Sequence, residues 1–235
     1  MIDAMAHDPD QIPLPDDNRR ALRQVARACR KATLATVLED GAPYASLVTV
    51  AFDHDLSPIL LLSGLADHTR NLAADGRCSL LLDGTDGLAN PQTGPRVTLT
   101  GRAAPAVDDG ALRARFLARH PGAALYADFA DFSIWRVAAE RAHFVGGFGR
   151  AVWFPAPFGL RPDTIAALAA AEAALVEQAN ASHPLPEGWR VAALDADGAD
   201  LANADQSRRL CFRAPVESPE QLRAALTESL SVSFG

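Results

Sequence analysis

The sequence predicts a mainly β fold, an antiparallel barrel, followed by a small α+β unit. Two observations indicate the barrel. Short aliphatic and β-branched runs succeed one another between residues 31 and 145, and most are separated by turn residues rather than helices. A third observation marks a boundary: after Pro155-Ala156-Pro157 the pattern changes to a long Ala-rich helical stretch. We therefore divide the chain into a tail (1–17), a barrel domain (18–156) and a small α+β C-terminal domain (157–235).

The first elements are the tail and a helix. Residues 1–17 are rich in Asp and Pro, which predicts a flexible segment. Asn18 is a suitable N-cap for a helix over 19–30, whose apolar face carries Leu22, Val25 and Cys29. The arginines on its other faces predict a surface that contacts solvent or a second subunit.

The barrel strands follow from alternating apolar and polar residues or from continuous apolar runs. Glu39-Asp40-Gly41 predicts a hairpin turn, because Asp-Gly tolerates the positive φ angles of tight turns. Helical segments are expected over 67–74, with Asp67 as N-cap, over 108–119 and over 123–132. The expected strands are 32–38, 44–52, 59–63, 78–83, 96–104, 133–138 and 141–145.

Beyond the boundary the pattern indicates two helices around a small sheet. A helix is expected over 163–179, hairpin strands around 195–198, and a strand over 210–213. Ser218-Pro219 then starts a helix over 219–230, with Ser as N-cap and Pro at the first helical position.

Composition argues against several functional classes. The net charge of −7 is unfavourable for a general nucleic-acid binder. The apolar runs are too short to span a membrane, and the acidic N-terminus lacks the apolar core of a secretory signal, so we expect a cytoplasmic protein without a membrane partner. The three cysteines are far apart and form no zinc or disulfide framework, so no metal site is predicted from them.

One dense patch of small polar and basic residues lies between Leu62 and Leu72. A strand ends in Ser63, a short loop follows, and the next helix starts with hydroxyl, imidazole and amide groups. Backbone N–H groups at a helix N-terminus favour a phosphate. The patch therefore predicts an anion cradle, composed of Ser63, Asp67, His68, Thr69, Arg70 and Asn71.

Several motifs occur in an order that resembles a known family. They are A-T-L-A-T (32–36), D-G-x-P-Y-A-S (40–46), S-x-L-x-x-H-T-x-N-L (63–72), R-V-T-L-T-G (96–101) and H-F-V-G-G-F-G-R-A (143–151). Together they resemble the split-barrel flavoproteins related to pyridoxamine 5′-phosphate oxidase, and most of all their haem-utilisation (HugZ-like) branch. The resemblance covers residues 31–153, and the segment from about 163 is similar to the small domain often appended in that branch.

The resemblance implies a six-stranded Greek-key split barrel and a homodimer with two equivalent sites at its interface. It implies FMN as the cofactor, with the phosphate held by Ser63, His68, Thr69 and Asn71. Ser46 and Val48 would lie along the isoalloxazine ring, and Arg96 would reach across the interface. Each residue also has a structural alternative, since first-turn helix side chains commonly bond to nearby backbone.

His143 is the candidate iron ligand if the cofactor is haem. It lies in an alternating strand beside a Gly-rich turn, where a structural histidine with a satisfied hydrogen bond is the alternative. Some haem-degrading members use a histidine near the C-terminal end, but this chain ends in S-V-S-F-G and its last histidine is His183. That departure argues against transferring haem-oxygenase activity.

Three hypotheses follow. The first is an FMN-dependent oxidoreductase that acts on a small-molecule substrate at a dimer interface, where the flavin carries the chemistry and no catalytic side chain is identified. The second is a haem-binding or haem-degrading protein of iron utilisation. The third is a non-catalytic module that binds a partner, because fold resemblance alone does not settle function.

Overall fold

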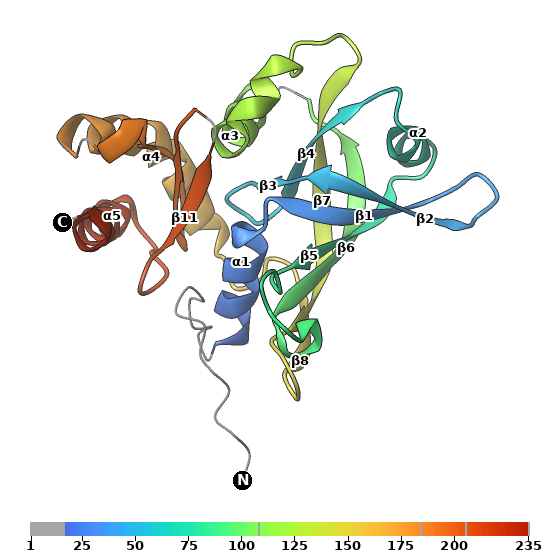
Figure 1. Cartoon of the computed structure of the whole chain (residues 1–235), viewed down its shortest axis with the longest axis horizontal. Coiled ribbons are helices and arrows are strands. Elements are labelled where there is room, and N and C mark those ends of the chain that lie inside the picture. The colour runs from blue at the N-terminus through green and yellow to red at the C-terminus, as the bar shows by residue number, and fades with distance from the viewer. Residues whose placement is uncertain (1–16, 108, 184, 205, 235) are drawn as a thin grey trace.

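A computed structural model describes residues 17–107, 109–183, 185–204 and 206–234, and the tail expected over 1–17 lies almost wholly outside them. Eight strands join one antiparallel sheet in the order β2-β1-β5-β6-β7-β4-β3, with β8 paired to β7. The sheet curls into the predicted split barrel, from which the β1–β2 hairpin projects (Figure 1). The strands are β1 (Lys31–Val37), β2 (Pro43–Thr49), β3 (Ala51–Phe52), β4 (Pro58–Ser63), β5 (Arg77–Asp83), β6 (Arg96–Pro105), β7 (Phe132–Val145) and β8 (Ala151–Pro155).

Six of these strands, β1, β2 and β4 to β7, correspond to the expected barrel, and the details differ at three places. The expected strand 44–52 is divided at Val50, whose N–H donates to Arg30 O (3.0 Å) and leaves β3 as a separate strand. The expected strands 133–138 and 141–145 are one continuous strand, β7. The whole of β6 pairs with residues 135–145 of β7, and the irregularity at Thr100 and Gly101 absorbs the shift in register. The short β8 was not predicted.

The helices of the barrel are α1 (Asn18–Ala28), α2 (Asp67–Ala74) and α3 (Gly110–Arg119). Both predicted N-caps are off by one residue. Asp17 caps α1 by accepting from Arg19 N (2.9 Å), and Ala66 precedes α2 without a side-chain cap. Three short 3₁₀ turns occur at Pro91–Thr93, Pro121–Leu125 and Pro186–Gly188. No helix within the described ranges is long and apolar enough to cross a membrane.

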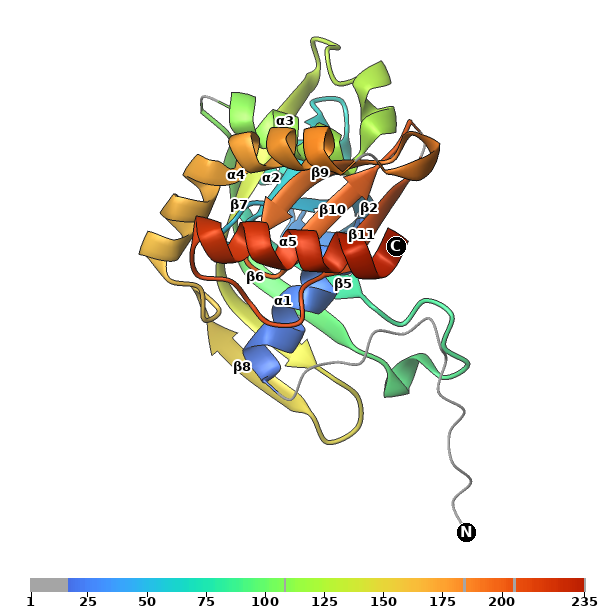
Figure 2. The same cartoon turned by 90° about the vertical axis from the view of Figure 1, so that its left-hand side faces the viewer.

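The C-terminal segment forms the predicted α+β arrangement. Strands β9 (Arg190–Asp195), β10 (Gly198–Ala202) and β11 (Ser207–Cys211) pair in the order β11-β10-β9. Helices α4 (Pro162–Ser182) and α5 (Pro219–Phe234) lie on one side of this sheet (Figure 2), and α1 and α3 of the barrel contact its strands. One apolar core runs from Leu34 in the barrel to Leu222 on α5, so the division at 156 and 157 stays a prediction.

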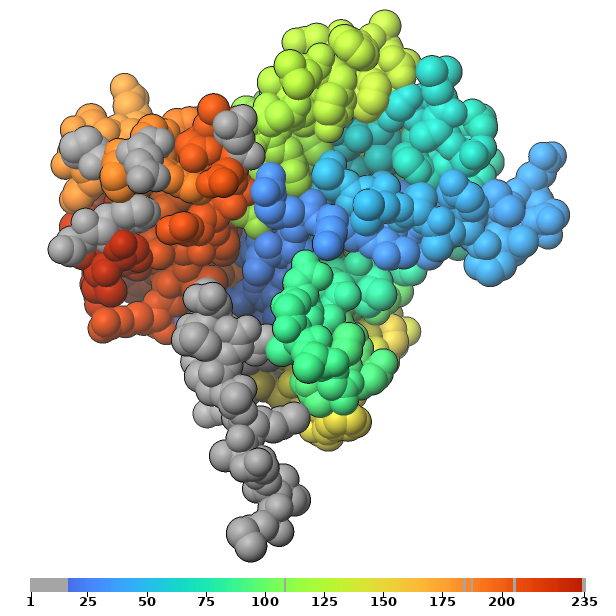
Figure 3. Space-filling view, viewed as in Figure 1, coloured from blue at the N-terminus to red at the C-terminus, as the bar shows by residue number. Residues whose placement is uncertain are grey.

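A cluster of buried charges joins the barrel to the C-terminal segment. Arg23 and Arg27 on α1, which we expected to face solvent or a second subunit, are buried against Asp195 and Asp197. The expectation is wrong because the pairing carboxylates are distant in sequence, 174 residues away for Arg23 and Asp197. Figure 3 shows the C-terminal segment packed against the barrel beside α1. The buried charge cluster consists of Arg23, Arg27, Arg115, Arg119 and Arg209 with Glu172, Asp195, Asp197 and Asp200.

Candidate functional site

The first candidate region is α2, which lies beside β1 and β2 (Figure 1). Two predicted site residues on α2 bond to the barrel. His68 Nδ1 is 3.1 Å from Ser46 Oγ on β2, and Asn71 Nδ2 donates to Thr36 Oγ1 on β1 at 3.0 Å. Val48 is buried in the barrel core. The structure thus brings Ser46, His68 and Asn71 together on the inner side of the sheet, where these bonds hold α2 in place.

The hydroxyl groups of Ser63 and Thr69 differ in their surroundings. Ser63 Oγ donates to Asp131 Oδ2 (2.5 Å) and accepts from Leu65 N (3.1 Å), so it already has two partners. Thr69 Oγ1 is buried and has no hydrogen-bond partner among the described residues. An unpartnered buried hydroxyl is unfavourable, and it is the one polar group of the predicted cradle that lacks a structural role.

The charges around the start of α2 are mostly negative. Arg70 forms an exposed ion pair with Asp67 and donates to Leu65 O (2.7 Å), while Asp131 adds a second carboxylate beside Ser63. Burial lowers the pKa of His68, so this imidazole adds no positive charge at neutral pH. A doubly charged phosphate needs compensating cations. The residues that one subunit supplies here therefore do not fit the phosphate of FMN.

Arg96, the residue expected to help across an interface, lies at the opposite end of the sheet. It pairs with Asp83 at the end of β5, whereas α2 immediately precedes the start of β5. Its guanidinium donates to Gly94 O (3.2 Å). Within one subunit Arg96 therefore does not reach the α2 region.

The second candidate region is the outer face of the barrel sheet. Strand register aligns one residue from each of six strands in a single row across β2, β1, β5, β6, β7 and β8. Within this row the exposed fraction is 73 % for Leu47, 40 % for Leu81 and 48 % for Trp153. We call it the outer-face row, and its members are Leu47, Thr33, Leu81, Thr98, His143 and Trp153.

His143 lies at the β7 position of this row and is half-buried. Its ring stacks on Trp153, with centroids 4.7 Å apart and planes 15° apart. The guanidinium of Arg141 lies 4.6 Å from the centroid of the Trp153 ring. An imidazole, an indole and a guanidinium therefore occur together on an exposed apolar face, next to a row of the small residues Ala45, Ala35, Ser79 and Thr100.

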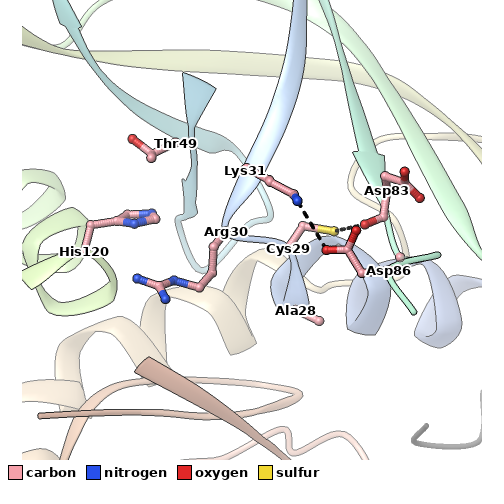
Figure 4. Close-up of a pocket in the computed structure, with 9 residues that line it drawn as sticks. Ala28, Cys29, Arg30, Lys31, Thr49, Asp83, Asp86 and His120 are labelled. Carbon is pink, nitrogen blue, oxygen red and sulfur yellow. Dashed lines mark hydrogen bonds and ion pairs between the residues drawn. The ribbon is translucent and has the colours of Figure 1, made fainter. Parts of the chain in front are cut away.

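The third candidate region is a pocket of about 500 Å³ where α1 ends and β1 begins (Figure 4). Several of its polar groups already have partners within the chain. His120 Nε2 donates to Val50 O (2.9 Å), and burial lowers the pKa of His120 to about 4, so the ring is neutral. Burial likewise raises the pKa of the Cys29 thiol to about 12, which argues against a reactive thiolate. The lining residues are Ala28, Cys29, Arg30, Lys31, Thr49, Asp83, Gly84, Asp86 and His120.

Sequence reasoning did not identify this pocket, because its lining comes from the ends of several elements between residues 28 and 120. No local motif connects those positions. In the described part of the chain, no group of three His, Cys, Asp or Glu side chains is arranged to hold a metal ion.

Comparison with known proteins adds evidence from sequence and fold. A family model described as pyridoxamine 5′-phosphate oxidase matches residues 19–146. "Non-canonical heme oxygenase HOZ, chloroplastic" from Arabidopsis thaliana is 41 % identical over 116 residues, which is 48 % of this chain and 34 % of that protein. The match therefore spans only about a third of the relative's length.

Two solved structures match almost the whole chain. A protein of unknown function from Agrobacterium tumefaciens str. C58 has a TM-score of 0.73 and 29 % identity, and covers 94 % of this chain and 100 % of its own. A heme binding protein from Mycobacterium smegmatis has a TM-score of 0.56 and 29 % identity, and the match covers 94 % of this chain and 99 % of that protein's chain. Both therefore share the barrel and the C-terminal segment. With the family model matching just over half of the sequence, the chain belongs to the pyridoxamine 5′-phosphate oxidase family.

Proposed function

We propose that this protein binds haem on the outer face of its barrel sheet, where His143 would hold the iron. The observation that carries the proposal is the outer-face row, which places His143 beside Trp153 and Arg141 on an exposed apolar surface. The names of two relatives, a heme oxygenase and a heme binding protein, support the same ligand.

The chemistry of this face suits a flat apolar molecule with two carboxylates. Leu47 and Leu81 offer exposed apolar surface, and the small side chains of the adjacent row permit close approach. Arg141 has no carboxylate partner among the described residues and is available to bind a propionate. Bound haem would supply iron redox chemistry, while the chain would bind and orient it.

A second copy of the chain is part of this proposal. The outer-face row leaves large apolar side chains exposed, and contiguous exposed apolar surface marks interaction sites. A second copy placed against this face would shield a haem held by His143 from water. The homodimer expected from the sequence is therefore retained as a proposal.

Haem titration tests the assignment. Adding hemin to the purified protein is expected to produce a Soret band that saturates, and His143→Ala is expected to shift this band and lower affinity at least about tenfold, roughly 1.4 kcal/mol. His183→Ala is the matched histidine control. Arg141→Met is expected to weaken haem binding, whereas Arg208→Met, which removes another arginine stacked on a tryptophan, is expected to leave it unchanged. An unchanged Soret band in His143→Ala contradicts the proposed ligand.

Flavin binding is the second candidate function. The partnerless Thr69 hydroxyl and the free N–H groups at the start of α2 favour it, while the carboxylates of Asp67 and Asp131 oppose it. If FMN binds and hemin does not, the protein is a flavoprotein, and a second subunit helps to neutralise the phosphate of FMN. If neither binds, the third hypothesis, a partner-binding module, remains.

A further inference from the structure

The buried charge cluster contains one more arginine than carboxylates. Its five arginine side chains are each at most 8 % exposed, and its four carboxylates face them. His54 lies 2.8 Å from Glu172 and cannot supply a negative charge to offset this excess. The closest pairs are Arg23 with Asp197 (2.8 Å), Arg209 with Asp195 (2.7 Å), Arg119 with Asp200 (2.9 Å) and Arg115 with Glu172 (2.5 Å).

Arg27 is the arginine without a carboxylate of its own. It shares Asp195 (3.1 Å) with Arg209 and Asp197 (3.4 Å) with Arg23. Its other contacts are to backbone carbonyls, including His54 O at 2.8 Å, and these do not neutralise a charge. Burial lowers the pKa of Arg27, which reflects the cost of holding this charge away from water.

A small cavity lies within the cluster. It measures about 10 Å³, roughly the space for one water-sized particle, and four arginines and two aspartates line it together with Ala51 and Phe52. Among the described residues, buried Arg209 Nε has no hydrogen-bond partner, and buried Arg27 Nε makes only the long 3.4 Å ion-pair contact with Asp197. Both residues line the cavity, so unsatisfied donors and an excess positive charge occur at the same place.

Other acidic groups near the cluster do not supply the missing negative charge. Asp53 and Asp55 share Arg136, which leaves one carboxylate in excess there, but their side chains are 25 % and 32 % exposed to water and form no ion pair with an arginine of the cluster. Burial raises the pKa of the Cys211 thiol, which therefore stays neutral. A water molecule in the cavity would satisfy an N–H group but would leave the charge uncompensated.

We propose that one monatomic anion of the halide class, such as chloride, occupies this cavity between the barrel and the C-terminal segment. The size of the cavity excludes sulfate and phosphate, which carry four oxygens around a central atom. Bound there, the anion neutralises the fifth arginine and accepts from N–H groups that otherwise make no hydrogen bond among the described residues. It thereby stabilises the contact between α1, α3 and the C-terminal sheet.

Thermal unfolding of the full chain tests this site. Chloride is exchanged for gluconate at constant ionic strength, because gluconate is monovalent but too large for the cavity. The midpoint is expected to rise with chloride, saturate, and shift by roughly 3–6 °C, with bromide acting similarly. Equal midpoints in chloride and gluconate overturn the proposal.

Two variants separate the site from a general salt effect. Arg27→Met removes the fifth arginine and leaves each carboxylate with one arginine, so the halide dependence is expected to disappear. Arg161→Met makes the same charge change in an exposed ion pair with Asp163 and is expected to retain it. Halide dependence that persists in Arg27→Met contradicts the assignment. If Arg27→Met does not fold, crystals of the natural chain grown with bromide decide: an anomalous peak in the cavity supports the site, and its absence refutes it.

Discussion

The buried charge cluster and the outer-face row place opposite kinds of side chain in opposite surroundings. The cluster buries nine charged groups, and residues of the same chain pair with them across the contact between barrel and C-terminal segment. The row exposes Leu47, Leu81 and Trp153 on a face that no other part of the described chain covers. The charged groups of the cluster find their partners within the same subunit, and we propose that the row finds its partner in another molecule.

This difference predicts how each region responds to substitution. Charges in the cluster lie in a low-dielectric environment, so removal of one partner leaves an uncompensated charge. The large apolar side chains on the row are already 40–73 % exposed, so their replacement leaves folding nearly unchanged and affects what binds there. Variants that remove one member of a cluster ion pair are therefore expected to be less stable, and row variants are expected to dissociate or lose a ligand.

The largest effect is expected from Asp195→Asn. Asp195 lies within 3.1 Å of both Arg209 and Arg27, and burial alone would raise its pKa, yet these arginines hold it below its usual range. Loss of the charge is expected to reduce the free energy of unfolding by about 3–5 kcal/mol, measured by urea denaturation. Asp163→Asn, in an exposed ion pair, is the control and should leave the midpoint unchanged. Similar midpoints for both variants would mean that the cluster is not a stabilising contact.

A change of pH tests the edge of the cluster through His120. Its pKa is lowered to about 4, mainly by burial, so between pH 6.5 and 4 the unfolded chain takes up a proton that the folded chain does not. Stability is therefore full above pH 6.5 and falls as the pH decreases toward 4, by about 3 kcal/mol in total. In His120→Gln most of the decline between pH 6.5 and 5 should vanish in urea denaturation. If the decline persists unchanged, another group is responsible.

Leu81→Asp tests the outer-face row. A carboxylate in the middle of an apolar contact is expected to weaken self-association about a hundredfold, roughly 2.7 kcal/mol, while leaving the circular dichroism spectrum unchanged. Light scattering across a dilution series measures the effect. Val232→Asp on α5 is the control, since Val232 is 70 % exposed on a different surface. A monomeric natural chain, or a dimeric Leu81→Asp, would exclude this face as the dimer contact.

Thr69→Val is expected to have the smallest effect. It tests a side chain that is buried, as in the cluster, but lacks a partner within the described chain, as on the row. The Thr69 hydroxyl is buried like the cluster but partnerless, so its removal should increase stability by about 1 kcal/mol. The variant should be compared with the natural chain by urea denaturation and by FMN titration. A fivefold loss of FMN affinity would instead place the phosphate at this hydroxyl and favour the flavin assignment.

Much of the barrel was predictable because its signals are local. The alternation of apolar and polar residues along β1, β2 and β6 can be recognised from neighbouring residues alone. The predicted turn at Asp40-Gly41 is confirmed by the positive φ of Gly41 (+85°). Pro219 at the start of α5 is likewise a local signal. The single long β7 was missed because its continuity depends on pairing with β6, a contact between distant segments.

The site divides in the same way. His68 was expected at a site from the residues around it, and Ser46 only from the family resemblance. Only the structure shows that the two bond to each other and that Arg96 lies at the far end of the sheet. The outer-face row depends on the strand order. Because β5 lies between β1 and β6, Thr33 and Trp153 come into the same row although they are far apart in sequence. The buried charge cluster depends entirely on tertiary structure. Its α1 arginines, Arg23 and Arg27, have the spacing of a solvated helix face, and whether a charge is solvated or paired depends on which distant carboxylate packs against it.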